Sequence, residues 1–129
     1  MGKFRKVDIR EMGSGNAGGT NAFRTQGSLF ALGVITIDIL KGFIAVHYIG
    51  EGGGSLIPYM CGFASVIGHI YPIYYNFKGG KGAGTLIGVL IALPIPKLII
   101  LTLIFVWIIV IIISGYVGLG TILTSLSFP

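Results

Sequence analysis

Long apolar runs, separated by short polar and glycine-rich stretches, dominate the hydropathy pattern of this chain. The first run extends from Ser28 to Ile49 and the second from Leu56 to Tyr75. Each has about the 20 residues that an α-helix needs to cross the hydrocarbon core of a bilayer. Pro72 is expected to end or kink the second helix, because proline lacks a backbone N–H. The pattern therefore predicts two membrane-crossing helices in this part of the chain.

The third apolar run, Leu86 to Ile113, is interrupted at Pro94-Ile95-Pro96-Lys97. Two prolines this close disfavour a continuous helix, so we expect two helices that fold back at this point. An arm starting near Gly82 would have ~12 residues and rise only ~18 Å, so a single long crossing stays open as the alternative. A further apolar segment begins at Tyr116 and stops at Pro129.

Composition supports the membrane interpretation. Hydrophobic residues make up 53% of the 129 residues and charged residues only 10%, with a mean hydropathy of +0.91. A soluble domain carries roughly 25% charged residues. We therefore predict an all-α polytopic membrane protein with about four to five transmembrane helices, some of them short or broken. The net charge of +5 does not indicate a nucleic-acid partner, because in a membrane protein the positions of the charges matter more than their sum.

Folding back at the prolines would place most cations on one side of the membrane, with only Lys97 opposite. The cations on the crowded side are Lys3, Arg5, Lys6, Arg10, Arg24, Lys78 and Lys81. Cytoplasmic loops carry an excess of lysine and arginine, so we expect this side to face the cytoplasm in a multi-pass protein of the cell (plasma) membrane.

Two charged residues, Asp38 and Lys41, stand inside the first apolar run. They are three residues apart and so share one helical face. Unpaired charges at membrane depth are expensive, so the two side chains should pair with each other or face the protein interior. We favour a structural ion pair that links neighbouring helices, and a direct contact with a ligand stays open.

Two glycine-rich polar stretches, residues 13–21 and 77–85, interrupt the apolar pattern. The second packs two lysines and four glycines into nine residues. Glycine allows the backbone to approach a ligand and point its N–H groups into a concave nest, and lysine adds a charge suited to phosphate. We expect Thr20 or Asn21 to cap a short helix that carries Arg24, and residues 51–54 to form a turn. Together with a turn at Tyr116–Thr121, both stretches should meet on the cationic side and hold a phosphate-bearing ligand.

Three familiar motifs fail on closer inspection. Gly13-x-Gly15-x-x-Gly18 matches a dinucleotide fingerprint, but no strand precedes it and Asp38, at the distance of the acidic partner, lies in a membrane segment. Gly80-Lys81 lacks the hydroxyl residue that must follow the lysine of a P-loop. Neither His47 nor His69 has an aspartate five residues later, as a His-x-x-x-x-Asp acyltransferase would require.

The chain resembles, instead, the bacterial membrane glycerol-3-phosphate acyltransferases that use acyl phosphate as donor. Their first signature is similar to Asp8-Ile9-Arg10 followed by Gly13-Ser14-Gly15-Asn16-x-Gly18-x-Thr20-Asn21-x-x-Arg24-x-x-Gly27. Their second is similar to Gly68-His69-x-Tyr71-Pro72-x-x-x-x-Phe77-Lys78-Gly79-Gly80-Lys81-Gly82. The intervening Asp38-x-x-Lys41-Gly42 also fits, and Thr121 stands where the family has a serine. Differences at Gly19 and Ala83-Gly84 exchange one small residue for another.

The resemblance implies a single membrane-embedded domain over residues 1–129. Residues 1–27 would form a cytoplasmic signature segment, and residues 28–129 the helices with the loop 77–85. The family has a further helix before this region and a third signature after it, so we expect the domain to be incomplete relative to the family.

The resemblance also implies the chemistry. A fatty acyl group would pass from acyl phosphate to the 1-hydroxyl of glycerol 3-phosphate, giving lysophosphatidate and phosphate, with the acyl chain between helices in the bilayer. Ser14, Asn16 and Thr20 would cradle the acyl phosphate, and Arg24 and Lys81, with Thr121, would hold glycerol 3-phosphate. The family is thought to need no side-chain base, because a phosphate oxygen of the substrate takes the proton. No cofactor or metal is expected.

The expected catalytic residues are Ser14, Arg24, His69 and Lys81. The expected substrate-binding residues are Gly13, Ser14, Gly15, Asn16, Gly18, Thr20, Asn21, Arg24, Lys78, Gly79, Gly80, Lys81, Gly82 and Thr121. Lys78 is equally compatible with a membrane-surface anchor. For His69 a hydrogen-bonded structural role is slightly favoured over a catalytic one, and a Ser14–His69 nucleophile requires the two side chains to meet in space.

Two other functions remain open at this stage. A truncated, non-catalytic subunit would bind phosphate headgroups, and a small anion transporter would use Asp38 and Lys41 as its intramembrane charge site. The residues identify no protein partner.

Overall fold

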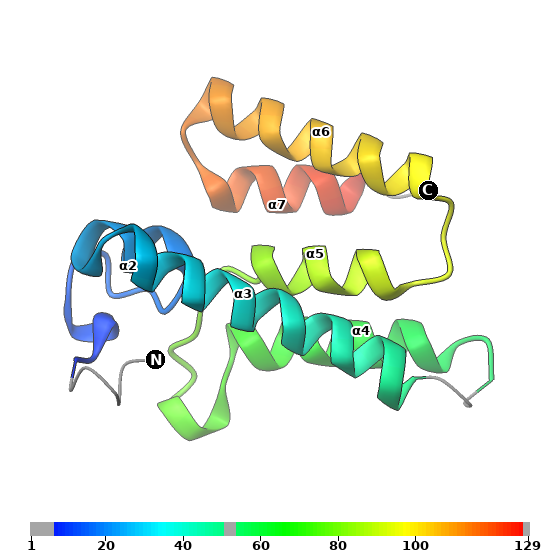
Figure 1. The fold of residues 1–129 in the computed structure, drawn as a ribbon, viewed down its shortest axis with the longest axis horizontal. Helices are drawn as coiled ribbons and strands as arrows, with labels where there is room; N and C mark the ends of the chain where they lie inside the picture. The colour runs from blue at the N-terminus through cyan, green and yellow to red at the C-terminus, as the bar shows by residue number, and fades with distance from the viewer. Residues whose placement is uncertain (1–6, 51–53, 128–129) are drawn as a thin grey trace.

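The computed structural model describes residues 7–50 and 54–127, so most of the expected turn at residues 51–54 lies outside the described residues. Within these ranges every regular element is a helix, as predicted (Figure 1). The α-helices are α2 (Gly19–Gln26), α3 (Ser28–Ile44), α4 (Ile57–Ile70), α5 (Ala83–Ala92), α6 (Lys97–Ser114) and α7 (Val117–Leu126). The short elements are the 3-10 helices η1 (Ile9–Glu11) and η3 (Ile73–Tyr75) and the π-helical turn η2 (Ala45–Ile49).

The first predicted crossing is confirmed, and the second is shorter than expected. Helix α3 and the π-helical turn η2 form one apolar helix from Ser28 to Ile49, whose 22 residues rise ~33 Å. Helix α4 has only 14 residues, or ~21 Å. It ends at Ile70 because the residue before Pro72 is pushed out of the helical conformation, which confirms the role expected of that proline.

The chain folds back at the two prolines, as predicted. Helix α5 ends at Ala92, and α6 begins at Lys97 directly after Pro96 and runs in the opposite direction (Figure 1). Helix α6 is long and apolar enough to cross a membrane, whereas the 10 residues of α5 rise only ~15 Å.

The turn expected at Tyr116–Thr121 is wrong for most of its length. Gly115 makes the turn with a φ of +72°, and α7 is already helical from Val117. Glycine suits position 120 of α7 because the helix packs closely on α6 there. A Cβ atom at Gly120 would lie 3.1 Å from the Ile111 side chain. Close packing against α6 thus outweighs the weak helix propensity of glycine.

The cationic and the opposite ends of the molecule are arranged as the fold-back predicts. Helix α2 and the N-terminal ends of α5 and α7 lie at one end, and the start of α6 lies at the other (Figure 1). Arg24 and Lys81 therefore belong to the first end and Lys97 to the second. Lys3, Arg5 and Lys6 lie outside the described residues.

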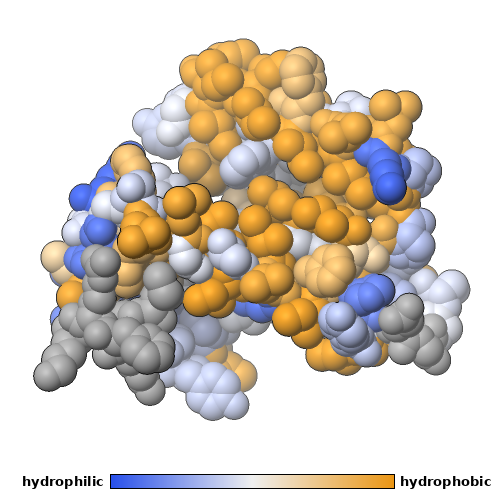
Figure 2. Space-filling model, in the orientation of Figure 1, coloured by the Kyte–Doolittle hydropathy of each residue, from blue (hydrophilic) through white to orange (hydrophobic). Residues whose placement is uncertain are grey.

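An unusually apolar surface surrounds these helices. Figure 2 shows hydrophobic side chains over most of the visible faces of α3 and α6. Only Leu103 of α6 is buried, while Leu98, Leu101 and Phe105 are exposed. Soluble proteins rarely expose apolar surface on this scale, so these faces are suited to contact lipid.

Glycines bring α3 and α5 into backbone contact. A Cβ atom at Gly42 would lie 2.2 Å from the Thr85 carbonyl oxygen, and one at Gly88 would lie 1.9 Å from the Ile39 carbonyl oxygen. Small residues are what allow membrane helices to approach this closely. The seam between α3 and α5 therefore depends on the absence of side chains at these positions.

We predict that Gly88→Ala lowers the free energy of unfolding by about 1–3 kcal/mol, because the new methyl group would collide with the backbone of α3. Gly68→Ala in α4 is the matched control, since a Cβ atom there meets nothing within 4 Å. Unfolding in mixed detergent micelles measures both. Equal stability of the Gly88→Ala variant and the parent would contradict the close seam.

Candidate functional site

A cavity of about 770 Å³ opens at the cationic end of the helices. It receives Ala17 from the first glycine-rich stretch and Lys78, Gly79 and Gly80 from the second. The remaining wall comes from the N-terminal segment, from α3 and from the region at the end of α4: Val7, Asp8, Ile9, Arg10, Phe30, Val34, Ile37, Asp38, Lys41, Gly68, His69, Pro72 and Tyr75. Both glycine-rich stretches thus reach one cavity, the first through Ala17, whereas no residue of the expected turn at Tyr116–Thr121 lines it.

Asn21 organises the first glycine-rich stretch. Its side chain is 1% exposed. Its amide oxygen accepts a hydrogen bond of 2.9 Å from the Ser14 N–H. Its amide nitrogen donates to the carbonyl oxygens of Ile9, Met12 and Asn16 at 2.8–3.0 Å. Asn21 therefore holds the loop in shape from inside.

The expected cap of α2 is wrong. Gly18, and neither Thr20 nor Asn21, is the N-cap residue. The Asn16 side chain accepts a hydrogen bond of 2.9 Å from the Gly18 N–H just before the helix. Asn21 lies inside α2, and its amide is engaged by backbone groups of the preceding loop.

Glycine at position 13 is required by both conformation and space. Gly13 has a φ of +57°, in the left-handed region that other residues rarely adopt. A Cβ atom there would also lie 2.4 Å from the Asn21 amide oxygen. The first stretch is thus a tight loop wrapped around the Asn21 side chain.

The second glycine-rich stretch lies against His69. A Cβ atom at Gly79 would be 2.0 Å from the His69 carbonyl oxygen, and one at Gly80 would be 2.0 Å from His69 Nε2. The Gly80 N–H donates to the same carbonyl at 3.2 Å. Gly82 then starts α5 in a left-handed conformation. Only glycine at 79 and 80 allows the loop to cover the end of α4.

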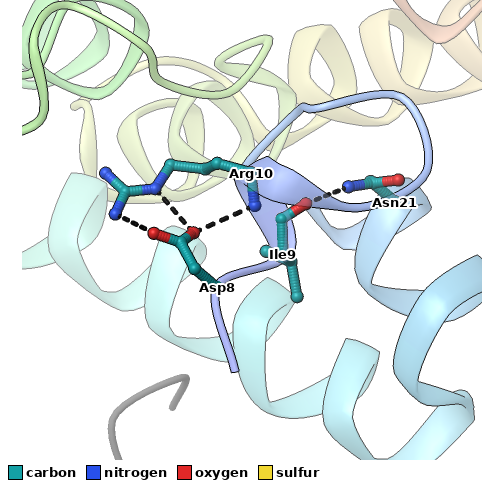
Figure 3. A network of polar contacts seen from close by, with 4 residues as sticks. All are labelled: Asp8, Ile9, Arg10 and Asn21. Carbon is teal, nitrogen blue, oxygen red and sulfur yellow. Dashed lines mark hydrogen bonds and ion pairs between the residues drawn. The ribbon is translucent and has the colours of Figure 1, made fainter. Parts of the chain in front are cut away.

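The N-terminal segment lines one side of the cavity and contains an ion pair between Asp8 and Arg10 (Figure 3). The Asp8 carboxylate accepts hydrogen bonds from Arg10 Nε at 2.8 Å and from the Arg10 backbone N–H at 3.0 Å. The Arg10 guanidinium lies 4.0 Å above the centre of the Tyr75 ring, a cation–π contact with η3. Hydrogen bonds from the Arg10 side chain and backbone lower the pKa of Asp8 from 3.8 to about 2.

The ion pair predicted inside the first apolar helix is confirmed. Lys41 Nζ lies 2.7 Å from Asp38 Oδ1, and the pair extends to His69 on α4. It thereby links two helices, as expected. His69 does not meet Ser14, because its polar side-chain contacts are with Asp38 and Lys41, and Ser14 is absent from the cavity wall.

Arg24, Lys78 and Lys81 are exposed, and none of them has an ion-pair partner within residues 7–50 and 54–127. The Lys81 side chain extends to the first turn of α7, where a Cβ atom at Gly118 would lie 3.8 Å from Lys81 Cδ. Thr121 follows one turn later, and its hydroxyl accepts a hydrogen bond from Trp107 Nε1 at 3.3 Å. The structure thus places these cations where an anion from solution can reach them.

The structure divides the expected site residues into two groups. His69, Lys78, Gly79 and Gly80 form part of the cavity wall. The others lie outside that wall: Gly13, Ser14, Gly15, Asn16, Gly18, Thr20, Asn21, Arg24, Lys81, Gly82 and Thr121. Sequence reasoning did not select Asp8, Arg10 or Tyr75, although Asp8-Ile9-Arg10 belongs to the first signature and could have pointed to two of them.

We predict that Asn21→Ala disorders the first glycine-rich stretch, because the variant removes the acceptor of the Ser14 N–H and a donor to the Ile9, Met12 and Asn16 carbonyls. An N–H that is left unpaired and kept from water costs about 1–3 kcal/mol. Hydrogen exchange should show faster exchange of the Ser14 amide in this variant. Gln26→Ala, which removes only a contact of 3.8 Å to the Met12 sulfur, is the control and should leave exchange unchanged. Equal protection in Asn21→Ala would contradict the organising role.

The Asp8–Arg10 pair predicts a pH dependence. Since the folded pKa of Asp8 is lowered from 3.8 to about 2, the stability that the pair contributes is fully present above pH 3.8 and is lost as the pH falls through about 2. Arg10→Gln should return the pKa of Asp8 towards 3.8, whereas Arg24→Gln should not change it. Carbon-13 NMR titration of the carboxyl group measures this, and a pKa near 3.8 in the parent would contradict the pairing.

Comparison with known proteins bears on the identity of this fold and site. The family model for glycerol-3-phosphate acyltransferase matches residues 1–129. The glycerol-3-phosphate acyltransferase of Finegoldia magna is 46% identical over 123 residues, covering 95% of this chain and 61% of the relative. That of Chlorobium luteolum is 40% identical over 141 residues, covering 98% and 58%.

Solved structures agree. The crystal structure of PlsY (YgiH), an integral membrane glycerol 3-phosphate acyltransferase, in its glycerol 3-phosphate form has a TM-score of 0.82 and 37% identity. The match covers 97% of this chain and 62% of that one. Its lysophosphatidic acid form has a TM-score of 0.80 and 36% identity. The chain spans about three fifths of the length of these relatives. From the family match over residues 1–129 and the shared membrane fold, we conclude that this chain belongs to the glycerol-3-phosphate acyltransferase family.

Proposed function

We propose that this chain forms the substrate-binding core of a membrane acyltransferase. The reaction transfers a fatty acyl group from acyl phosphate to the 1-hydroxyl of glycerol 3-phosphate. The cavity that joins both glycine-rich stretches at the cationic end is the observation that carries this proposal. The PlsY forms with glycerol 3-phosphate and with lysophosphatidic acid support it, because these compounds are the acyl acceptor and the acylated product of such a reaction.

The charges at this end suit two phosphate-bearing substrates. Arg10 and Lys41 are neutralised by Asp8 and Asp38. Arg24, Lys78 and Lys81 are not neutralised within the described residues, so they are available for phosphate oxygens. Arginine favours bidentate contact with phosphate, while lysine acts as a point charge.

The cavity wall is also suited to an amphiphile. Phe30, Val34 and Ile37 of α3 line one side, while Lys78, Gly79 and Gly80 line another. An acyl phosphate has a fatty chain and a charged headgroup, so each part would find a matching surface. The exposed position of Ile37 on α3 gives the fatty chain a route to lipid.

Positioning and electrostatic stabilisation supply the catalysis in this proposal. The 1-hydroxyl oxygen attacks the acyl carbon, the bond from that carbon to the phosphate oxygen breaks, and inorganic phosphate leaves. The hydroxyl proton passes to a phosphate oxygen, so no side-chain base is required. Ser14, Asn16 and Thr20, whose stretch reaches the cavity wall at Ala17, cradle the headgroup of the acyl phosphate. Arg24, Lys81 and Thr121 hold glycerol 3-phosphate beside the cavity. Orientation of two bound substrates can contribute about 7–11 kcal/mol to lowering such a barrier.

We further place this end of the protein at the cytoplasmic side of the cell membrane. Arg10, Arg24, Lys78 and Lys81 gather there, and Lys97 alone of the described cations stands at the start of α6 opposite. This asymmetry follows the positive-inside rule. In sealed inverted vesicles, added glycerol 3-phosphate would then reach the cavity, whereas in right-side-out vesicles it would not.

The direct test is acyl transfer by this chain in lipid, with acyl phosphate and labelled glycerol 3-phosphate. Lys81→Ala should lower product formation about 10- to 100-fold, the effect of losing a charged hydrogen bond of roughly 1.5–3 kcal/mol. Lys97→Ala is the matched control at the opposite end and should retain the parent's rate. Both variants should keep the parent's helix content by circular dichroism.

The remaining outcomes separate the competing functions. A folded parent that binds glycerol 3-phosphate without forming lysophosphatidate would overturn catalysis by this chain and favour a non-catalytic core. Anion flux across the vesicles without acyl transfer would favour a transporter based on Asp38 and Lys41. Equal loss in the Lys81→Ala and Lys97→Ala variants would refute the assignment of the site.

A further inference from the structure

Three polar side chains meet beneath the second glycine-rich stretch. Asp38 and Lys41 come from one face of α3, and His69 comes from the end of α4. Lys41 Nζ donates to Asp38 Oδ1 at 2.7 Å and also contacts His69 Nδ1. The His69 side chain is only 6% exposed, so its ring is held by these neighbours more than by water.

The contact with Lys41 determines which ring nitrogen of His69 carries the proton. An ammonium group has three N–H donors and no acceptor. The Nδ1 atom that faces the ammonium group must therefore offer a lone pair. A proton on Nδ1 would place two donors, Nδ1–H and the Lys41 N–H, against each other. A neutral imidazole then carries its proton on Nε2. Asp38 is the other polar neighbour of Nδ1, with its Oδ1 3.3 Å from that nitrogen, but Lys41 Nζ lies closer to Nδ1 and also donates to the same Oδ1.

The protonated edge of the ring faces the glycine-rich loop. His69 Nε2 lies directly against Gly80, where a Cβ atom would approach it to 2.0 Å. His69, Gly79 and Gly80 all belong to the wall of the same cavity, together with Lys78. The Gly80 N–H is already bonded to the His69 carbonyl, so the ring can supply a donor that this backbone amide does not.

We propose that Lys41, anchored by Asp38, holds His69 as the Nε2–H tautomer, so that the imidazole gives the cavity a neutral hydrogen-bond donor for a phosphate oxygen. Lys41 and Asp38 are positioning residues in this arrangement. His69 takes no proton from the substrate. The identity of the oxygen rests on the proposed function, whereas the tautomer rests on the contacts of His69 alone.

The opposite arrangement would have opposite chemistry. If His69 donated Nδ1–H to Asp38, its Nε2 would carry a lone pair and act as a general base, as in a Ser-His-Asp triad. The two arrangements differ only in which partner, Lys41 or Asp38, governs Nδ1. The nitrogen-15 signals of the ring distinguish them, because a different nitrogen carries the proton in each arrangement. In a histidine with only a structural role, these signals would not change when a ligand binds.

Nitrogen-15 NMR of the whole chain, labelled at histidine and studied in lipid at neutral pH, tests the proposal. The chain has two histidines, so His69→Gln assigns the signals and His47 serves as an internal reference. We expect a protonated Nε2 and an unprotonated Nδ1 for His69, and a shift of the Nε2 signal on adding inorganic phosphate. A protonated Nδ1 in the parent would overturn the proposal, whether or not the chain transfers acyl groups.

Variants of Lys41 test the cause of the tautomer. Lys41→Met should reverse it, because Nδ1–H can then donate to Asp38, and phosphate affinity measured at Nε2 should fall about 10-fold. Lys41→Arg retains a donor and should keep the parent's tautomer. An unchanged Nε2–H signal in folded Lys41→Met would contradict the role of Lys41. If that variant does not fold, the tautomer of the parent and of Lys41→Arg still decides. Loss of acyl transfer with the Nε2–H tautomer intact would count against the proposed function alone.

Discussion

The close approach of α3 and α5 is the constraint on which the rest of the structure depends. Their backbones touch because glycine occupies positions 42, 84 and 88. At Gly84 the seam lies against Asp38 itself, with 2.9 Å between a Cβ atom and the Asp38 Cβ. The start of α5 is thereby fixed beside the charged turn of α3. The loop that precedes α5 must then lie over the end of α4, where His69 receives it.

Charge is divided in this molecule between two tasks. Arg10 and Lys41 are each held by an aspartate and have structural roles, one joining the N-terminal segment to Tyr75 and the other joining α3 to His69. Arg24, Lys78 and Lys81 remain exposed at the same end. An anion that reaches this end would therefore meet exposed cations, unpaired among the described residues, beside a frame whose own charges are paired. Such a division limits the cost of burying charge in a membrane protein.

Local sequence features predicted much of the fold. The run from Ser28 to Ile49, the fold-back at the two prolines and the Asp38–Lys41 pair all follow from spacing along one helix or from the geometry of proline. Glycines and lysines likewise indicated which two stretches would meet at the cavity. These features succeed because hydropathy and helix periodicity act over a few residues.

Features that depend on distant contacts were predicted less well. Asn21 was expected to bind substrate or cap α2, yet its amide is engaged by four backbone groups of the preceding loop. The turn expected before Thr121 became helix because Gly120 packs on α6. The place of Tyr75 in the cavity wall was not predicted, and there it contacts Arg10, which lies far away in the sequence. Hydropathy and helix periodicity carry no signal for such contacts between a loop and a helix or between two helices.

The central claim is that the cationic end of the helices, at the second glycine-rich stretch, binds the phosphate of glycerol 3-phosphate. Solid-state NMR can test it by measuring how bound phosphorus-31 dephases nitrogen-15 in the lysine side chains of the chain in bilayers. We predict dephasing of Lys81 Nζ at hydrogen-bond distance, and none of Lys97 Nζ at the opposite end. Phosphorus bound near Lys97, or bound without dephasing either Lys78 or Lys81, would contradict this account of the site.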